Sequence, residues 1–186
     1  MSENKDIRQF LDEWLDCLNT VSFSKLPDMD LYMDQLTTLL EKNLEGYKRI
    51  KSEKILTKTM INNYTKDAVL PPPEKKKYSV EHAALLIIIY HLKREISMSD
   101  IALLFDAVEE VKLGVEKFYR YFEEIQKHEL ERLEKEIQEN LSLADFLEEN
   151  DEGVRNTLFA VSLIISSSLR KHIAEKIIDS LIPKLS

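Results

Sequence analysis

The sequence predicts a mainly α-helical protein, and three observations support this. Only 3 Gly and 5 Pro occur in 186 residues, too few for a sandwich or barrel with many tight turns. Leu, Glu, Lys and Ile are frequent, a bias that favours helices. Apolar residues make up 44 % of the chain, enough for a packed core. The length allows one domain or two small ones.

Apolar side chains recur at helical spacing through most of the chain. In chain order, the main expected helices span residues 6–18, 35–47, 57–66, 80–95, 100–107, 111–141 and 154–181. In the first helix, Trp14 is expected to anchor the core and Cys17 to be a small, buried or half-buried apolar residue. A short extended piece is expected over residues 31–33, and Asp34 is the expected N-cap of the second helix.

The helix expected over residues 57–66 has two different sides. At 100° per residue, Met60, Ile61 and Tyr64 fall on one edge, which is expected to be buried. The opposite face carries Lys, Asn and Thr side chains, which suit phosphate oxygens and base edges. The candidate nucleic-acid-binding residues of this face are Lys58, Thr59, Asn62, Asn63 and Lys66. The alternative reading is an ordinary solvated surface helix.

A basic loop follows that helix. Three prolines, from Pro71 to Pro73, prevent the helix from continuing, because proline lacks a backbone donor and restricts the residue before it. An extended basic loop beside a polar-faced helix is how a winged helix-turn-helix grips a duplex. The candidate residues of this loop are Lys75, Lys76, Lys77 and Tyr78. A solvated lysine run is the alternative.

The segment before this helix, residues 48–54, is also basic. It is longer than the usual three- or four-residue turn of a helix-turn-helix. Its cations either contact backbone phosphates or keep an exposed loop soluble. These cations are Lys48, Arg49, Lys51 and Lys54.

The helix expected over residues 80–95 is apolar on nearly all sides of its middle, so we expect it to be the central buried helix. Ser79 is its expected N-cap. A further capping serine precedes the helix expected over residues 100–107. His82 and His91 lie nine residues apart, a helical spacing that does not bring them to one metal ion, so they are expected to be structural or surface residues.

Two long helices are expected in the C-terminal region. An apolar stripe predicts one uninterrupted helix over residues 111–141, and a second over residues 154–181. Between them we expect a capping box at residues 142–145, a short helix reaching residue 149 and a turn at residues 150–153. The stripe is either a coiled-coil seam between two chains or one wall of a monomeric bundle.

Charge is unevenly distributed along the chain. The formal net charge of −8 taken alone disfavours a nucleic-acid partner. Residues 42–82, however, hold ten basic and five acidic side chains, a net charge of +5, whereas residues 1–41 carry −6 and residues 83–186 carry −7. Basic charge is therefore concentrated around the candidate helix and loop, and local potential matters more for docking than the total.

Several classes of protein are disfavoured. A single cysteine permits no disulfide within one chain and no thiol metal cluster. The first residues are polar and charged, unlike a signal peptide. The longest apolar runs are far shorter than the roughly 20 residues of a membrane span. The sequence has no nucleophile elbow, Walker loop, zinc-protease motif or Gly-rich dinucleotide turn. We therefore expect a cytoplasmic protein with no membrane contact, no cofactor, no metal and no enzymatic activity.

The segment around the candidate helix and loop resembles the MerR-type DNA-binding domain. In that family a helix ending in tyrosine leads to Leu-Pro, a wing, and Tyr-Ser opening a long apolar helix. The matching positions are Tyr64, Leu70, Pro71, Tyr78 and Ser79. More closely, roughly residues 7–110 resemble an uncharacterised bacterial family, domain of unknown function 1836, described as MerR-like.

The sequence departs from the MerR pattern at three positions. Asn62 stands where Arg is usual, and Asn63 stands where Tyr is usual, so the usual phosphate and base contacts differ. Ala68 stands where Gly is usual, which suggests a different backbone path out of the helix, because alanine tolerates positive φ poorly.

The resemblance implies a MerR-like helix-turn-helix domain over residues 1–108 and a helical C-terminal region over residues 109–186. It implies a transcription regulator that binds double-stranded DNA, with the helix of residues 57–66 in the major groove and the loop of residues 71–78 as wing. Related proteins pair through a long helix, so a homodimer through residues 111–141 and 154–181 is expected. The alternative is a helical protein-interaction module that keeps this fold without binding DNA.

An effector pocket is a weaker hypothesis. Four aromatic residues could line such a pocket against the last helix, but aromatic residues at helical spacing more often belong to the core. These residues are Phe118, Tyr119, Tyr121 and Phe122.

Overall fold

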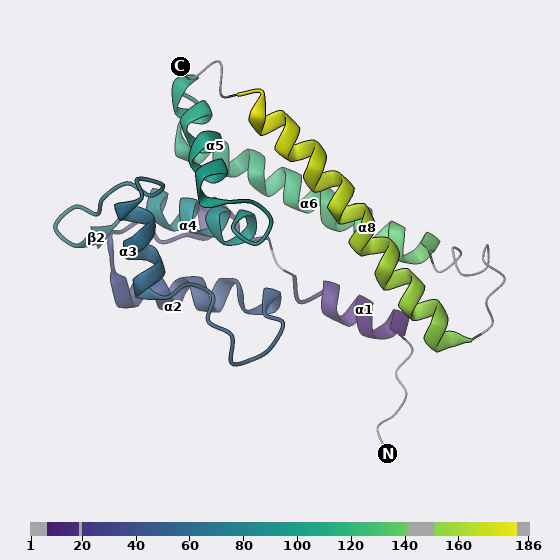
Figure 1. Cartoon of the computed structure of the whole chain (residues 1–186). Helices are drawn as coiled ribbons and strands as arrows, with labels where there is room; N and C mark the ends of the chain where they lie inside the picture. The colour runs from purple at the N-terminus through teal and green to yellow at the C-terminus, as the bar shows by residue number, and fades with distance from the viewer. Residues whose placement is uncertain (1–6, 19, 141–150, 182–186) are drawn as a thin grey trace.

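The computed structural model describes residues 7–18, 20–140 and 151–181, which form a mainly helical protein (Figure 1). The helices are α1 (Ile7–Leu15), α2 (Met33–Asn43), α3 (Lys58–Lys66), α4 (Val80–Leu92), α5 (Met98–Glu110), α6 (Val115–Asn140) and α8 (Glu152–Asp179). The shorter elements are the 3-10 turns η1 (Phe23–Lys25) and η2 (Glu45–Tyr47) and the strands β1 (Leu31–Tyr32) and β2 (Lys77–Tyr78). The prediction of a mainly helical fold is confirmed. Within the described ranges, no helix has the length and apolarity needed to span a membrane.

Helix α4 lies at the centre of the larger hydrophobic core. All residues from Ala83 to Tyr90 are buried, so every side of this stretch packs against protein. Helices α2 and α6 and strand β2 surround it. Ser79 is the N-cap residue of α4, and its backbone N–H donates to Nδ1 of His82 at 3.1 Å. The expected central buried helix and its N-cap are confirmed.

Strand β1 leads directly into α2. Tyr32 is the N-cap residue of α2, and its backbone N–H donates to Oε1 of Gln35 at 2.9 Å. The prediction of Asp34 as N-cap is therefore wrong, because the helix begins two residues earlier than expected and Asp34 lies in its first turn. An acidic side chain there still favours the helix start through the helix dipole.

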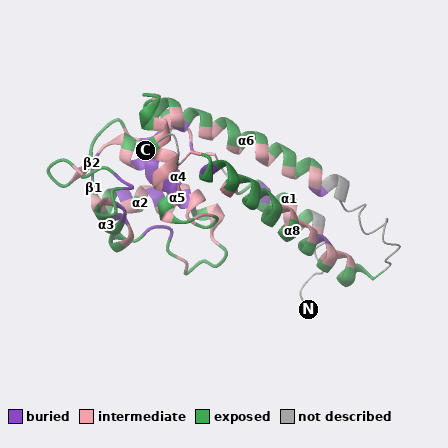
Figure 2. Ribbon diagram, turned by 45° about the horizontal axis from the view of Figure 1, so that its top comes forward, coloured by how far each residue is buried: buried purple, intermediate pink, exposed green. Residues whose placement is uncertain are grey.

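A smaller core joins α1, α6 and α8 beyond the α4 core (Figure 2). Its buried residues are Leu15 and Leu18, at and just after the end of α1, Ile137 of α6 and Phe159 of α8. Trp14 was expected in the core but is 42 % exposed, and Cys17 is exposed rather than buried, so both predictions are wrong. Leu15 and Leu18 fill this core instead, which leaves the other two side chains exposed.

Gly46 lets η2 approach the backbone that follows α1. A Cβ built on Gly46 would lie 2.1 Å from the carbonyl oxygen of Cys17, closer than any side chain can sit. The smaller core is thus fastened to the larger one by a backbone contact that only glycine permits.

Helices α5 and α6 are separate, although the sequence predicted one uninterrupted helix from residue 111. Lys112 follows the end of α5 with φ 52°, and Gly114 has φ 79°, so the chain turns before Val115 begins α6. Leu113 N–H donates to Val108 O at 3.3 Å and Lys112 N–H to Glu109 O at 2.8 Å, which closes α5 with a Schellman motif. The α6 helix itself is confirmed, but its start was misplaced because the glycine signal was overlooked.

Helix α8 is apolar on two sides. Phe159 and Ile178 are its buried residues and lie near its two ends. On its outer side Val161, Ile165, Leu169 and Ile173 recur every four residues and are 44–63 % exposed. Asp151 is its N-cap, and its Oδ1 accepts from Val154 N–H at 2.9 Å. The turn expected over residues 150–153 is therefore wrong for Glu152 and Gly153, which belong to α8. The capping box and short helix expected over residues 142–149 lie outside the described residues.

Candidate nucleic-acid interface

Helix α3 is oriented by its apolar edge. Ile61 and Tyr64 are buried and Met60 packs partly against the same core, as the periodicity predicted. Thr57 caps the helix start, where its Oγ1 accepts from Met60 N–H at 3.2 Å. Because this edge faces inward, the polar face turns to solvent. Its exposed residues are Lys58, Thr59, Asn62, Asn63 and Lys66.

The end of α3 is closed by a left-handed residue. Ala68 has φ 58°, the conformation that glycine usually supplies at this place. Its N–H donates to Thr65 O at 3.3 Å, and Val69 N–H donates to Tyr64 O at 3.0 Å, which is the Schellman pattern. The expectation that alanine would redirect the backbone is therefore wrong. The hydrogen bonds and the burial of Val69 hold Ala68 in a strained conformation.

The basic loop after α3 is a narrow hairpin. Leu31 pairs with Tyr78 in the antiparallel ladder, and the pairing continues to a bridge between Glu74 and Lys77. Lys77 N–H donates to Glu74 O at 2.8 Å, and the two residues between them, Lys75 and Lys76, have φ 47° and φ 65°. Two successive positive φ values define a type I′ turn, in which Asn-Gly is the favoured pair. Here two exposed lysines occupy both positions.

The remaining wing residues anchor the hairpin. Tyr78 is only 3 % exposed, its burial raises the pKa of its hydroxyl, and its ring packs edge-on to His82 with centroids 5.5 Å apart. Lys77 is half-buried, and its Nζ lies 5.5 Å from the ring centroid of Tyr32 on the paired strand. Tyr78 and Lys77 thus hold the wing base, while Lys75 and Lys76 extend from the tip.

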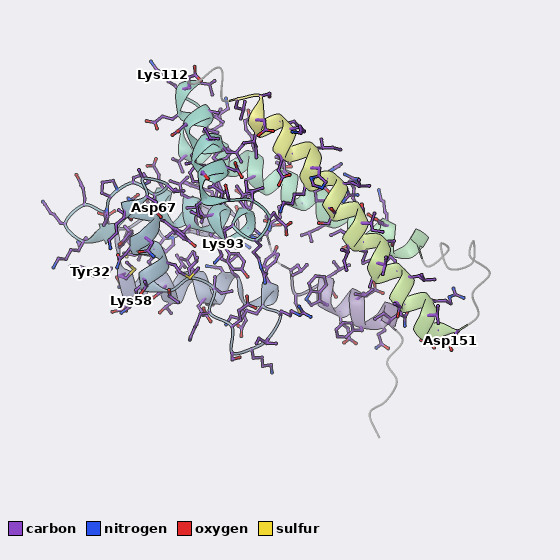
Figure 3. The ribbon with its side chains drawn as sticks, viewed as in Figure 1. Tyr32, Lys58, Asp67, Lys93, Lys112 and Asp151 are labelled. Carbon is purple, nitrogen blue, oxygen red and sulfur yellow. The ribbon has the colours of Figure 1, made fainter. Side chains whose placement is uncertain are left out.

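Acidic side chains lie beside the candidate face at two places. Asp34 of α2 pairs with Lys58 at the start of α3, and Asp67 is the residue that caps its end (Lys58 and Asp67 are labelled in Figure 3). Both members of the Asp34–Lys58 pair are more than half exposed, and exposed pairs contribute roughly 0–1 kcal/mol. Lys58 can therefore exchange this carboxylate for a phosphate at small cost.

A polar hollow of about 580 Å³ separates α2 from the segment before α3. Glu41 accepts from Lys48 Nζ and from Ile55 N–H, and the hydrogen bond from Lys48 is the main cause that lowers the pKa of Glu41. Lys48 is therefore engaged inside the fold by Glu41, an environment that the sequence analysis did not anticipate. Lys42 and Lys54 line the same hollow from exposed positions. Lys42 was overlooked, because it lies on a separate helix and only folding brings it beside the others.

The histidines and aromatic residues have structural environments. Nε2 of His91 lies 3.3 Å from Nε2 of Gln126, which donates to Tyr47 Oη at 2.7 Å. Desolvation and then the Arg94 charge lower the pKa of His91 to about 4, and burial with the nearby Tyr90 raises the pKa of Tyr47 to about 12. No cluster among the described residues could hold a metal ion.

Three of the four aromatic residues proposed for an effector pocket instead join the larger core. Tyr119 is fully buried and its hydroxyl donates to Val21 O at 2.8 Å. Phe118 and Phe122 pack partly against the same core, and Tyr121 is exposed. The core interpretation fits Phe118, Tyr119 and Phe122 but not Tyr121.

The segment from η1 to the first part of α6, which contains the whole candidate interface, matches a known family over residues 21–122. The chain belongs to the family described as Domain of unknown function (DUF1836). The DUF1836 match includes α3, the wing, α4 and α5, and stops within α6, before α8. No curated protein and no solved structure matches the chain.

Proposed function

We propose that the protein is a DNA-binding transcription regulator of the MerR-like winged helix-turn-helix type. In this proposal α3 enters the major groove and the loop of residues 71–78 acts as the wing. Exposure of the whole polar face of α3 supports it, since Asn and Lys side chains read base edges and phosphates. The net charge of +5 over residues 42–82 gives this part of the chain the sign that a duplex attracts.

The observation that carries the proposal is the tip of the wing. Lys75 and Lys76 occupy consecutive left-handed positions, each of which costs a non-glycine residue roughly 1–2 kcal/mol. Their side chains are exposed, and neither forms an ion pair within the part of the chain that the structure describes. Strain retained at an exposed tip is typical of sites where function overrides stability. Two cations held on a narrow hairpin beside a polar helix suit a phosphate backbone.

We further propose that two chains pair through α8 and α6. The outer row of α8 from Val161 to Ile173 exposes branched apolar side chains over about three helical turns, and Ile125 of α6 is 63 % exposed. Such a row is a surface that a second apolar helix covers. A twofold pair would present two α3 helices to major-groove sites about 34 Å apart, as in other dimeric helix-turn-helix proteins.

Binding to fragments of the source genome, measured by selection and then by fluorescence anisotropy, tests the proposal. Asn62→Ala is expected to weaken binding to selected sites by about 1–3 kcal/mol and to leave nonspecific DNA unaffected. The double variant Lys75→Gln and Lys76→Gln is expected to weaken binding to DNA of any sequence. It is also expected to reduce the slope of log affinity against log salt concentration by about 2. Replacing Lys25 and Lys112 by Gln is the matched charge control, because both are exposed and lie outside α3, the wing and the proposed pairing helices. Binding that is insensitive to the first three changes would refute the assignment of these residues.

A helical protein-interaction module is the second candidate. The exposed apolar row of α8 favours it, and so do the acidic flanks, which repel phosphate wherever they lie near it. This candidate predicts no DNA binding at low salt for any sequence. It also predicts that Leu169→Lys abolishes capture of a protein partner, whereas the DNA-binding proposal predicts that Leu169→Lys halves the solution mass.

A further inference from the structure

A hollow of about 700 Å³ lies under α8, bounded by α1, the end of α4, α5 and α6. This volume is in the range of small-molecule sites. Most of the lining is aliphatic or aromatic, including Trp14 of α1, Ile96 just before α5, Leu104 of α5 and Leu133 of α6. The apolar lining suits a hydrocarbon group.

The hollow exists because the side chains in the middle of α8 do not fill the space between α8 and the facing helices. Phe159 and Ile178 are buried near the two ends of α8 and anchor it. Between them, the lining is contributed partly by Ser166, Ser167 and Ala174, whose side chains are too short to reach the facing helices. Protein interiors are close-packed, and unfilled apolar space loses dispersion contacts. A guest with an apolar chain would restore those contacts.

Cations stand in the lining beside this apolar space. Nη2 of Arg170 lies 3.7 Å from Glu136, and Nζ of Lys171 lies 3.9 Å from Glu175. Both distances exceed the 2.7–2.9 Å or so of a charge-assisted hydrogen bond, so neither cation is fully engaged. Ser166, one turn before Arg170, adds a hydroxyl donor. This edge of α8 therefore suits an acidic head group.

We infer that this hollow binds an amphiphile with one long aliphatic chain and a carboxylate or phosphate head. The chain lies against the apolar walls of α1, α5 and α6, and the head lies at Arg170 and Lys171. Glu136 and Glu95 also line the hollow and would attract a cationic head. Comparison of acid, alcohol and ammonium probes therefore decides whether the two cations or these carboxylates recognise the head group. The inference does not depend on DNA binding, because none of the lining residues belongs to α3 or the wing.

Trp14, the only tryptophan of the chain, lines the hollow and reports on its contents. The delipidated full chain is titrated with hexadecanoic acid below its micelle concentration, with hexadecan-1-ol, and with a hexadecyltrimethylammonium salt. Binding of the acid is expected to shift Trp14 emission to shorter wavelength, with at least about tenfold tighter binding than the other two probes, the factor that corresponds to one charge-assisted pair. Vesicles of phosphatidylglycerol distinguish a lipid surface from a free acid, since only the free acid fits inside.

Two variants locate the site. Ser166→Leu fills the hollow and is expected to abolish the emission shift while the melting temperature is kept or raised. Arg170 is half exposed, so Arg170→Gln should not disturb folding. It is expected to weaken binding of the acid about tenfold and binding of the alcohol less than twofold. Lys176→Gln, an exposed cation of α8 outside the lining, is the matched control and should change neither.

Three results would overturn the inference. They are equal affinity for acid, alcohol and ammonium probes, an emission shift that persists in Ser166→Leu, and a change of solution mass in Ser166→Leu. The last would mean that side chains of a second copy fill the hollow.

Discussion

The double variant Lys75→Asn and Lys76→Gly at the wing tip separates the effect of backbone strain on stability from the effect of positive charge on DNA binding. Asn and Gly are the favoured residues of a type I′ turn, whereas lysine at either place is strained by roughly 1 kcal/mol. We expect the double variant to be more stable than the wild type by about 1–2 kcal/mol. For a chain of this length each kcal/mol raises the melting temperature by about 2–4 °C, so thermal unfolding followed by circular dichroism resolves the change.

The same variant is expected to lose DNA affinity although it is more stable. It removes two cations, so the slope of log affinity against log salt should fall by about 2, at roughly 0.9 per phosphate contact. Anisotropy of a labelled duplex between about 50 and 200 mM salt measures this slope. Higher stability with weaker binding excludes unfolding as the cause of the loss.

Two control variants separate the effect of charge from the effect of backbone strain. Lys75→Gln with Lys76→Gln removes the charge and keeps the strain, so it should lower the salt slope without raising the melting temperature. Lys112→Gly relieves the same strain in a third left-handed lysine, between α5 and α6 (top of Figure 3), and should raise the melting temperature with binding unchanged. The reasoning is refuted if the Asn-Gly variant melts lower than wild type, or if it melts higher and keeps the full salt slope.

Three further predictions follow from the fold. Ala68→Gly is expected to stabilise the protein by about 1 kcal/mol in urea unfolding, because the left-handed position after α3 suits glycine; a loss of stability would contradict the Schellman geometry. Gly46→Ala is expected to destabilise it by roughly 1–3 kcal/mol and to alter Trp14 fluorescence, because a Cβ collides with the Cys17 carbonyl; Gly153→Ala, in α8, is the control. His91, whose pKa is lowered to about 4, stays neutral in the folded state while the unfolded state binds a proton below about pH 6.5. The contribution of His91 to stability is therefore fully present above about pH 6.5, and the free energy of unfolding should fall by up to about 3 kcal/mol toward pH 4. Urea unfolding at pH 7 and pH 4.5 measures this difference, which His91→Phe should reduce.

Elements with strong apolar periodicity could be predicted from the sequence. The buried edge of α3 and the central position of α4 follow directly from the spacing of apolar residues. The polar face of α3 could be predicted equally well, because the face opposite a buried edge is exposed. What periodicity predicts is therefore the orientation of each helix, and with it most of the candidate site.

Positions decided by backbone conformation or by tertiary packing could not be predicted in this way. Ala68 takes a left-handed φ that its residue type disfavours, since hydrogen bonds to Tyr64 and Thr65 outweigh that cost. Trp14 lines the hollow under α8 and stays 42 % exposed, because Leu15 and Leu18 fill the smaller core against α6 and α8. The Ala68 outcome depends on backbone hydrogen bonds at the helix end, and the Trp14 outcome depends on residues far along the chain. Apolar periodicity encodes neither.

Strain by itself does not mark a functional position in this protein. Ala68 and Lys112 are also left-handed without being glycine, yet each simply terminates a helix and is held there by two helix-end hydrogen bonds. The wing tip differs in that two such residues are consecutive, both are lysine, and one backbone hydrogen bond, from Lys77 to Glu74, closes the turn. A hairpin selected for stability alone would relieve that strain with a single glycine. The proposed contact with DNA would account for the retention of both cations, and the salt slope of the Asn-Gly variant tests that contact directly.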